Sequence, residues 1–252
     1  MITLYVLDET EKFGQKQSPI NISLGITDFD SKLKASKLKF AYTIGDLKTI
    51  EKTKNGFSCK TGGECTSELS GSHLPGRYKL WEVHGHWGTE KNSGSEHLLN
   101  GKGFSAELHF VFRKMKYGKF DNCFDKRDGL TVLALFMEED SNDNTDFSPV
   151  ISGLRKLVKN SNHADLDKEF DLQNLLPKKL SYYSYEGSLT SKPFAECVIW
   201  TILKHRITIG TDQLAFLREI IPNNCRSLQP LNKRRVKRSF KLVKKSSSKD
   251  NN

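Results

Sequence analysis

Apolar, β-branched and aromatic residues gather in several short stretches that are typical of β-strands. The expected strands are residues 79–84, 105–112, 131–136 and 196–203. The last two are apolar almost throughout, as in strands inside a sheet. Residues 147–160 instead have helical spacing, with Val150, Leu154, Leu157 and Val158 on one stripe. Another short helix is expected to begin near Gln213, with Thr211 or Asp212 as its N-cap.

These elements predict a mostly β chain with a few peripheral helices. The 252 residues show no internal repeat and no linker rich in proline and glycine, so we expect one domain over residues 14–240. Residues 1–13 are an atypical N-terminal segment, and residues 241–252 are expected to form a disordered tail. No stretch approaches the roughly 20 apolar residues of a membrane span, and no secretory signal is apparent. A cytoplasmic location is therefore expected.

The formal net charge of +10 is concentrated near the C-terminus. Residues 232–252 carry nine Lys and Arg residues against Asp250 alone, which gives this segment +8 and leaves the rest near neutral. A nucleic-acid-binding domain is therefore not expected, although the tail could contact anionic surfaces. Five scattered cysteines argue against a disulfide framework. Reduced thiols and a Cys59–Cys65 bridge both remain open.

Three histidines in two of the apolar stretches form the main candidate for chemistry. His84 and His86 are two residues apart in an expected strand, so they share a face, and His109 can meet them from a neighbouring strand. Glu82 and Glu107 each stand two residues before a histidine, where a carboxylate can hold the ring of a metal ligand. Three neutral imidazoles with one open position are the ligand set of a catalytic zinc. The alternative is a cupin-type site of two histidines and Glu90, which leaves residues 107–109 unexplained.

Six motifs in order resemble the α-class carbonic anhydrases between residues 17 and 240. They are QSPINI (17–22), VHGHWG (83–88), GSEH with AELH (94–97 and 106–109), LLP (175–177), YYSYEGSLT (182–190), and Arg226 with QPL (229–231). The resemblance implies a large, twisted, predominantly antiparallel β-sheet with short surface helices. It also implies a zinc enzyme that hydrates carbon dioxide reversibly to bicarbonate and a proton, by hydroxide attack in an apolar pocket.

The same resemblance implies roles for individual residues. His84, His86 and His109 would bind zinc; Thr190 would orient the hydroxide and donate a hydrogen bond to Glu96. Glu82, Glu107 and the backbone carbonyl of Asn224 would support the three ligands. The substrate pocket would comprise Val111, Val132, Leu189, Ser191 and Trp200.

Several positions depart from the family pattern. Phe57 stands where fast members carry a proton-relay histidine, so we expect an enzyme limited by proton transfer. Glu82 replaces a glutamine, Gly85 replaces an aromatic residue, and Lys192 replaces a proline, which would loosen the loop that carries Thr190. We expect a monomer that acts on a small molecule. The alternative is a catalytically weak or silent relative that serves as a binding module.

Overall fold

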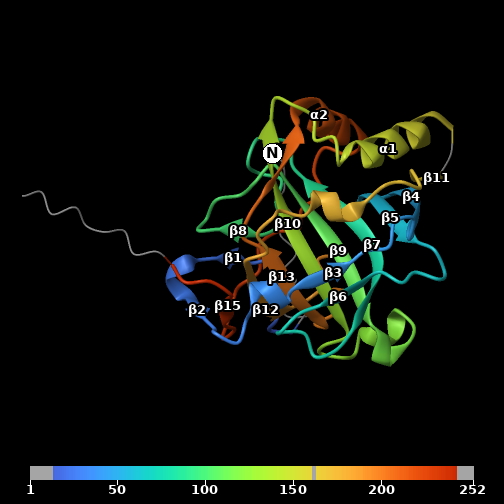
Figure 1. Ribbon diagram of the computed structural model, residues 1–252. Coiled ribbons are helices and arrows are strands. Elements are labelled where there is room, and N and C mark those ends of the chain that lie inside the picture. The colour runs from blue at the N-terminus through green and yellow to red at the C-terminus, as the bar shows by residue number, and fades with distance from the viewer. Residues whose placement is uncertain (1–13, 161–162, 243–252) are drawn as a thin grey trace, which may run out of the picture.

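A large twisted β-sheet runs through the part of the chain that the computed structural model describes, residues 14–160 and 163–242 (Figure 1). Its thirteen strands are β2 (Thr27–Phe29), β3 (Lys39–Ala41), β4 (Leu47–Thr53), β5 (Gly56–Thr61), β6 (Glu68–Ser70), β7 (Tyr78–Trp87), β9 (Ala106–Lys114), β10 (Leu130–Asp140), β11 (His163–Asp165), β12 (Tyr182–Gly187), β13 (Val198–Leu203), β14 (Ile207–Gly210) and β15 (Val236–Arg238). Two short strands, β1 (Asn21–Ile22) and β8 (Leu98–Leu99), form a separate parallel pair.

Most neighbouring strands of the large sheet run antiparallel. Its main path is β11–β4–β5–β7–β9–β10–β13–β12–β15–β2. Parallel pairing occurs where β10 meets β13 and β14, and where β15 meets β2. The central pairs β5–β7, β7–β9 and β9–β10 are all antiparallel. The predicted fold class, mostly β with a predominantly antiparallel sheet, is therefore confirmed.

The central strands are buried on both faces, which explains their nearly continuous apolar sequence. Along β9, Leu108, Phe110 and Phe112 enter one core, whereas Val111 enters a second core on the other face. The alternation places each core on its own side of the sheet. All four predicted strands correspond to observed ones, namely β7, β9, β10 and β13.

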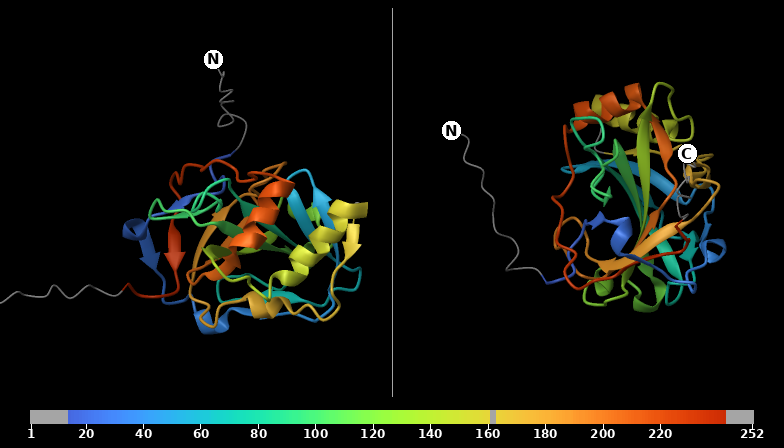
Figure 2. Two further views of the ribbon diagram at one scale, coloured as in Figure 1. Left: turned by 90° about the horizontal axis from the view of Figure 1, so that it is seen from above. Right: turned by 90° about the vertical axis from the view of Figure 1, so that its left-hand side faces the viewer.

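Two α-helices, α1 (Ser148–Asn160) and α2 (Thr211–Ile220), lie side by side at one end of the sheet (Figures 1 and 2). Within α1 the predicted stripe is buried at Val150, Leu154 and Leu157. Five short 3-10 helices complete the described elements, at Leu24–Ile26, Ala35–Lys37, Met115–Tyr117, Asp121–Cys123 and Leu172–Leu175. None of the helices in the described ranges is both long and apolar enough to cross a membrane.

The N-cap of α2 was predicted one or two residues too late. The cap is Gly210, whose backbone N–H donates to Oε1 of Gln213 at 3.0 Å. A Cβ at this position would lie 2.1 Å from Oδ1 of Asp143, so the close approach of that residue requires glycine. This contact joins segments that are far apart in sequence, which is why local capping preferences pointed elsewhere.

The predictions for the two ends of the chain fall largely outside the described residues, which leave out 1–13 and 243–252. The five cysteines are free in the structure, and both Cys59 and Cys65 are buried.

Candidate metal centre

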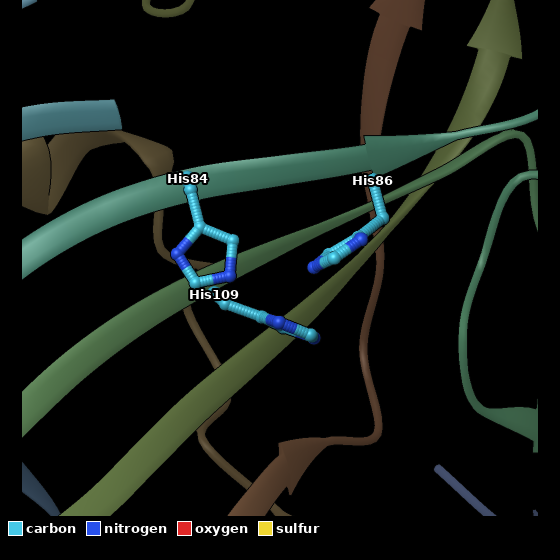
Figure 3. Close-up of side chains that lie close together, drawn as sticks. All are labelled: His84, His86 and His109. Carbon is cyan, nitrogen blue, oxygen red and sulfur yellow. The ribbon is translucent and has the colours of Figure 1, made fainter. Parts of the chain in front are cut away.

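Three histidines converge from the two central strands β7 and β9 (Figure 3). His84 and His86 project from the same face of β7, and His109 lies directly opposite His84 in the register of the antiparallel pair. The ring centroids are 4.6–5.2 Å apart. One nitrogen from each ring lies within 4.8 Å of the other two, so the three could hold one metal ion. The predicted meeting of these residues is thus observed.

The opposite nitrogen of each ring faces an acceptor in the protein. Nδ1 of His86 lies 3.1 Å from the carbonyl oxygen of Asn224, and Nε2 of His109 lies 2.8 Å from Oε1 of Glu107. These oxygens only accept, so Nδ1 of His86 and Nε2 of His109 carry the ring protons. Nδ1 of His84 is 3.2 Å from Oε1 of Glu82, at an angle that falls short of a hydrogen bond. The lone pairs of His86 and His109 are therefore left on the nitrogens that face the other rings.

The residues present fit a metal ion. Nε2 of His86 is buried and has no hydrogen-bond partner in the described chain, although buried polar atoms are nearly always paired. Burial holds the pKa of His86 well below its usual value and lowers that of His109 to about 4, so both rings are neutral near pH 7. Neutral imidazole is the ligand form for zinc, and also for copper, iron and nickel.

Asn224 is fixed by bonds on both sides of His86. Its side chain accepts from the backbone N–H of Trp87 at 2.8 Å and donates to the carbonyl of Gly85 at 2.9 Å. These contacts clamp the Asn224 side chain to the end of β7. They therefore also position the carbonyl that holds the His86 ring.

Glu107 is fully buried and bridges two histidines. Oε1 accepts from His109 and from Nδ1 of His97 at 2.7 Å, and Oε2 accepts from the backbone N–H of His97 at 2.8 Å. Burial acts to raise the pKa of Glu107, but the two histidines hold this pKa well below its usual value. His97 is in turn hydrogen-bonded through Nε2 to the Tyr185 hydroxyl at 2.7 Å. A role for His97 could not be predicted from the sequence, because spacing alone does not bring residue 97 beside residue 107.

Glu96 is fully buried next to His86 of the trio. Its Oε2 is 3.4 Å from Nε2 of His86, and Oε1 accepts from the backbone N–H of Arg226 at 2.9 Å. Burial raises the pKa of Glu96 to about 8, against the Thr190 side chain and the Arg226 N–H, which both act to lower it. The structure thus brings Thr190 and Glu96 together, as expected. The Thr190 loop is closed by a hydrogen bond from the N–H of Phe194 to the carbonyl of Ser191 at 2.8 Å, and Lys192 lies within this turn.

Two residues of β5 reach the same face as His84. Ser58 pairs with His84, and Lys60 pairs with Glu82. Ser58 donates to Oε2 of Glu82 at 3.0 Å, and Lys60 forms an ion pair with the same oxygen. Burial acts to raise the pKa of Glu82, but His84 and Lys60 hold this pKa well below its usual value. The two-residue alternation of β5 is the sequence signal that could have predicted Ser58 and Lys60 on the face of His84.

Phe57 does not point toward the histidine trio, which corrects the expectation for this position. It precedes Ser58 in β5 and so points to the opposite face, where its side chain is only 2% exposed. Its ring stacks on Trp87 at 6.0 Å and closes over Gly85, whose added Cβ would lie 3.2 Å from the Phe57 ring. Phe57 therefore fills core space that Gly85 leaves open.

The expected pocket residues lie on and beside the trio's face of the sheet. Val111, Val132 and Trp200 are neighbours across β9, β10 and β13, and each is at most 2% exposed. The Trp200 ring centroid is 4.9 Å from that of His109. Leu189 is half-buried and Ser191 is exposed. These apolar side chains of Val111, Val132 and Trp200 therefore lie next to the histidine trio, on the face of the sheet that carries His109.

Known proteins were compared with the chain as a whole. A family model described as eukaryotic-type carbonic anhydrase matches residues 8–240. Human carbonic anhydrase 3 is 34% identical over 242 residues, which cover 90% of this chain and 91% of the relative. Carbonic anhydrase 1 of Oryctolagus cuniculus is 34% identical over 239 residues, which cover 90% of this chain and all of the relative.

Proposed function

Because the chain belongs to the eukaryotic-type carbonic anhydrase family, we propose that it binds zinc and hydrates carbon dioxide reversibly to bicarbonate and a proton. The observation that carries the proposal is the trio His84, His86 and His109, with three ring nitrogens within 4.8 Å of one another. One of these, Nε2 of His86, is buried without a partner in the described chain. A cation at this point would satisfy it.

His84, His86 and His109 would hold zinc through Nε2, Nε2 and Nδ1, the nitrogens that face away from Glu82, Asn224 and Glu107. When bound by three neutral imidazoles, zinc supplies hydroxide at neutral pH by lowering the pKa of a coordinated water to about 7, a value known for carbonic anhydrases. The hydrogen bonds to Asn224 and Glu107 would keep the rings of His86 and His109 in the tautomer and orientation that this requires.

Thr190 and Glu96 would orient the attacking hydroxide. If the Thr190 hydroxyl donates its hydrogen bond to Glu96, the threonine oxygen can only accept, and it would orient a lone pair of the hydroxide toward the substrate. This needs an ionised Glu96. Its pKa of about 8 is expected to fall when a divalent cation occupies the trio, since Oε2 lies 3.4 Å from Nε2 of His86.

Carbon dioxide would rest against the apolar row Val111, Val132 and Trp200, with Leu189 beside it. These side chains offer no hydrogen bond to water, because the Trp200 N–H is already donated to the Ser188 carbonyl at 3.1 Å. An apolar wall next to the attacking group favours an uncharged substrate and disfavours retention of the charged product.

Proton release is expected to limit turnover. Phe57 occupies the sequence position of the relay histidine, but its side chain lies in the core. His73 is hydrogen-bonded to Thr201 and Tyr182, and burial lowers its pKa to about 4, so it does not titrate near pH 7. His97 is held by Glu107 and Tyr185. Excess protons would then have to leave with buffer molecules.

The test compares zinc content and carbon dioxide hydration in the wild type, in His109→Ala and in the control His205→Ala. His205 lies between β13 and β14, away from the trio. We expect one zinc per chain and hydration in the wild type and in His205→Ala, with both lost in His109→Ala. One zinc without hydration would favour the silent binding module, and a zinc-free, inactive wild type would contradict the proposed zinc enzyme.

A further inference from the structure

β12 and β13 have a second face, which borders a cavity of about 910 Å³. Tyr185 and Trp200 are neighbours across these strands, and Trp200 reaches the histidine trio. The next pair, Glu186 and Ile199, points the opposite way and lines the cavity with Ser184. The cavity therefore reaches the face of the sheet opposite the candidate metal centre, although Tyr185 also borders it and the Arg234 guanidinium lies over the Tyr185 ring.

Positive charge dominates the cavity lining. Seven cationic side chains face two carboxylates, those of Asp30 and Glu186; the cations are Lys16, Lys32, Arg127, Lys233, Arg234, Arg235 and Lys237. The remaining lining includes the apolar side chains of Leu33 and Ile199. The cavity thus combines a strong excess of positive charge with an apolar floor.

The two carboxylates neutralise only part of this charge. Glu186 is shared by Lys16 at 2.8 Å and Arg127 at 2.7 Å, and Asp30 pairs with Lys237 at 2.9 Å. Arg235 pairs with Asp28, 3.4 Å away. Three cations remain, namely Lys32, Lys233 and Arg234, and in the described chain none has a carboxylate at ion-pair distance.

Arg234 is the most enclosed of these three. It is half-buried, and its guanidinium donates to the carbonyls of Leu231, Glu186 and Pro230 at 2.7–3.1 Å. Three of its five N–H donors are used and its charge is not balanced, so donors remain for an anion. A guanidinium fixed in this way is suited to bidentate contact with phosphate oxygens.

The basic run near the C-terminus supplies much of this lining. From the sequence, these charges belong to a segment that could contact anionic surfaces. In the structure, β15 pairs with β12 on one side and with β2 on the other, which brings residues 233–235 and Lys237 to the cavity. Backbone pairing of β15 thus places several of these charges along one wall of the cavity.

We propose that this cavity binds a small organic anion carrying at least two phosphate groups. The volume is at the upper end of the roughly 300–1,000 Å³ typical of small-ligand pockets. Lys32, Lys233 and Arg234 would contact the phosphates, and a ring of the ligand would lie on Leu33 and Ile199. The proposal stands independently of zinc and of carbon dioxide hydration.

The test is calorimetric titration of the full-length, zinc-loaded protein with adenosine triphosphate, inorganic triphosphate and adenosine. We expect one nucleotide per chain, weaker binding of inorganic triphosphate, and weakening of at least about tenfold in Lys32→Glu/Lys233→Glu, because two charge-assisted contacts are lost. The control Lys156→Glu/Lys168→Glu changes the net charge equally at exposed positions outside the cavity and should bind like the wild type. Gln15→Trp, which narrows the cavity without a charge change, should also weaken binding.

Equal weakening by the two charge-reversal pairs would overturn the proposal, since it would reflect net charge alone. Nucleotide binding that is insensitive to both pairs would place the anion elsewhere, including at the metal centre, and would overturn it too. Binding of heparin or DNA without binding of the nucleotide would show a surface for polyanions instead. Equal affinity for the nucleotide and inorganic triphosphate would overturn the role of the apolar floor. Zinc content and thermal unfolding of each variant show whether it is folded.

Discussion

Phe57→His separates what the sequence suggests at this position from what the structure requires. By motif, the substitution restores a proton-relay histidine. In the structure, the side chain at position 57 points away from His84 and packs on Trp87 and Gly85. The new imidazole would therefore enter the core and would not reach the histidine trio.

The expected cost follows from burial. Phe57 is 2% exposed, and full burial of a phenylalanine side chain is worth about 1.5–3 kcal/mol, of which a neutral imidazole retains part. Ring nitrogens left without partners add about 1–3 kcal/mol. We expect Phe57→His to lower the free energy of unfolding by about 2–5 kcal/mol, a large share of the 5–15 kcal/mol typical of a domain.

The assay combines urea unfolding of the zinc-loaded protein with carbon dioxide hydration in dilute buffer, with and without imidazole. Phe57→Leu, which keeps an apolar side chain, is the stability control and should cost less. We expect the wild type and Phe57→His to be accelerated by imidazole to a similar extent. Ser58→His, on the face of His84, should reduce that response. The reasoning would be refuted by a Phe57→His protein of unchanged stability whose hydration no longer responds to imidazole.

Three further predictions concern the groups around the trio and His73. Glu107→Gln should weaken zinc binding about 10–100-fold, measured by competition with a chelator. Glu82→Gln should lower the midpoint of the pH–rate profile and Lys60→Met should raise it, because removing a negative charge near the site favours hydroxide and removing a positive one disfavours it; shifts in the same direction would contradict this. The pKa of His73 is lowered by burial to about 4, so the unfolded chain binds the extra proton between about pH 6.5 and 4, and stability falls as the pH falls through this range. His73→Gln should therefore lose about 2 kcal/mol less than the wild type between pH 7 and pH 5, measured by urea unfolding.

Residues whose placement depends on strand alternation were predictable. The two-residue period puts His84 and His86 on one face and Glu107 on the face of His109, and no distant contact is needed to derive this. The four central strands were found for the same reason. Their buried faces demand apolar and β-branched residues, which leave a clear pattern in the sequence.

Residues whose placement depends on distant packing were not predictable. Phe57 belongs to the core because Gly85, on the neighbouring strand, leaves the space that its ring fills. Gly210 caps α2 because Asp143 approaches its backbone. His97 joins Glu107 across the turn between β8 and β9. Each case rests on a contact between segments that neither local propensity nor motif spacing brings together.

The polar groups around the trio give the best argument that its bare nitrogens are functional. Glu107 is a fully buried carboxylate, a group that is costly unless it is paired, and it accepts three hydrogen bonds from His97 and His109. The Asn224 amide group is likewise bonded at both ends. Next to these paired groups, Nδ1 of His84, Nε2 of His86 and Oε2 of Glu96 are buried without hydrogen-bond partners in the described chain. Leaving such atoms unpaired costs about 1–3 kcal/mol each. Of these three atoms, Nε2 of His86 faces the other two rings, so the cation that we propose at the trio is the ligand that would satisfy it.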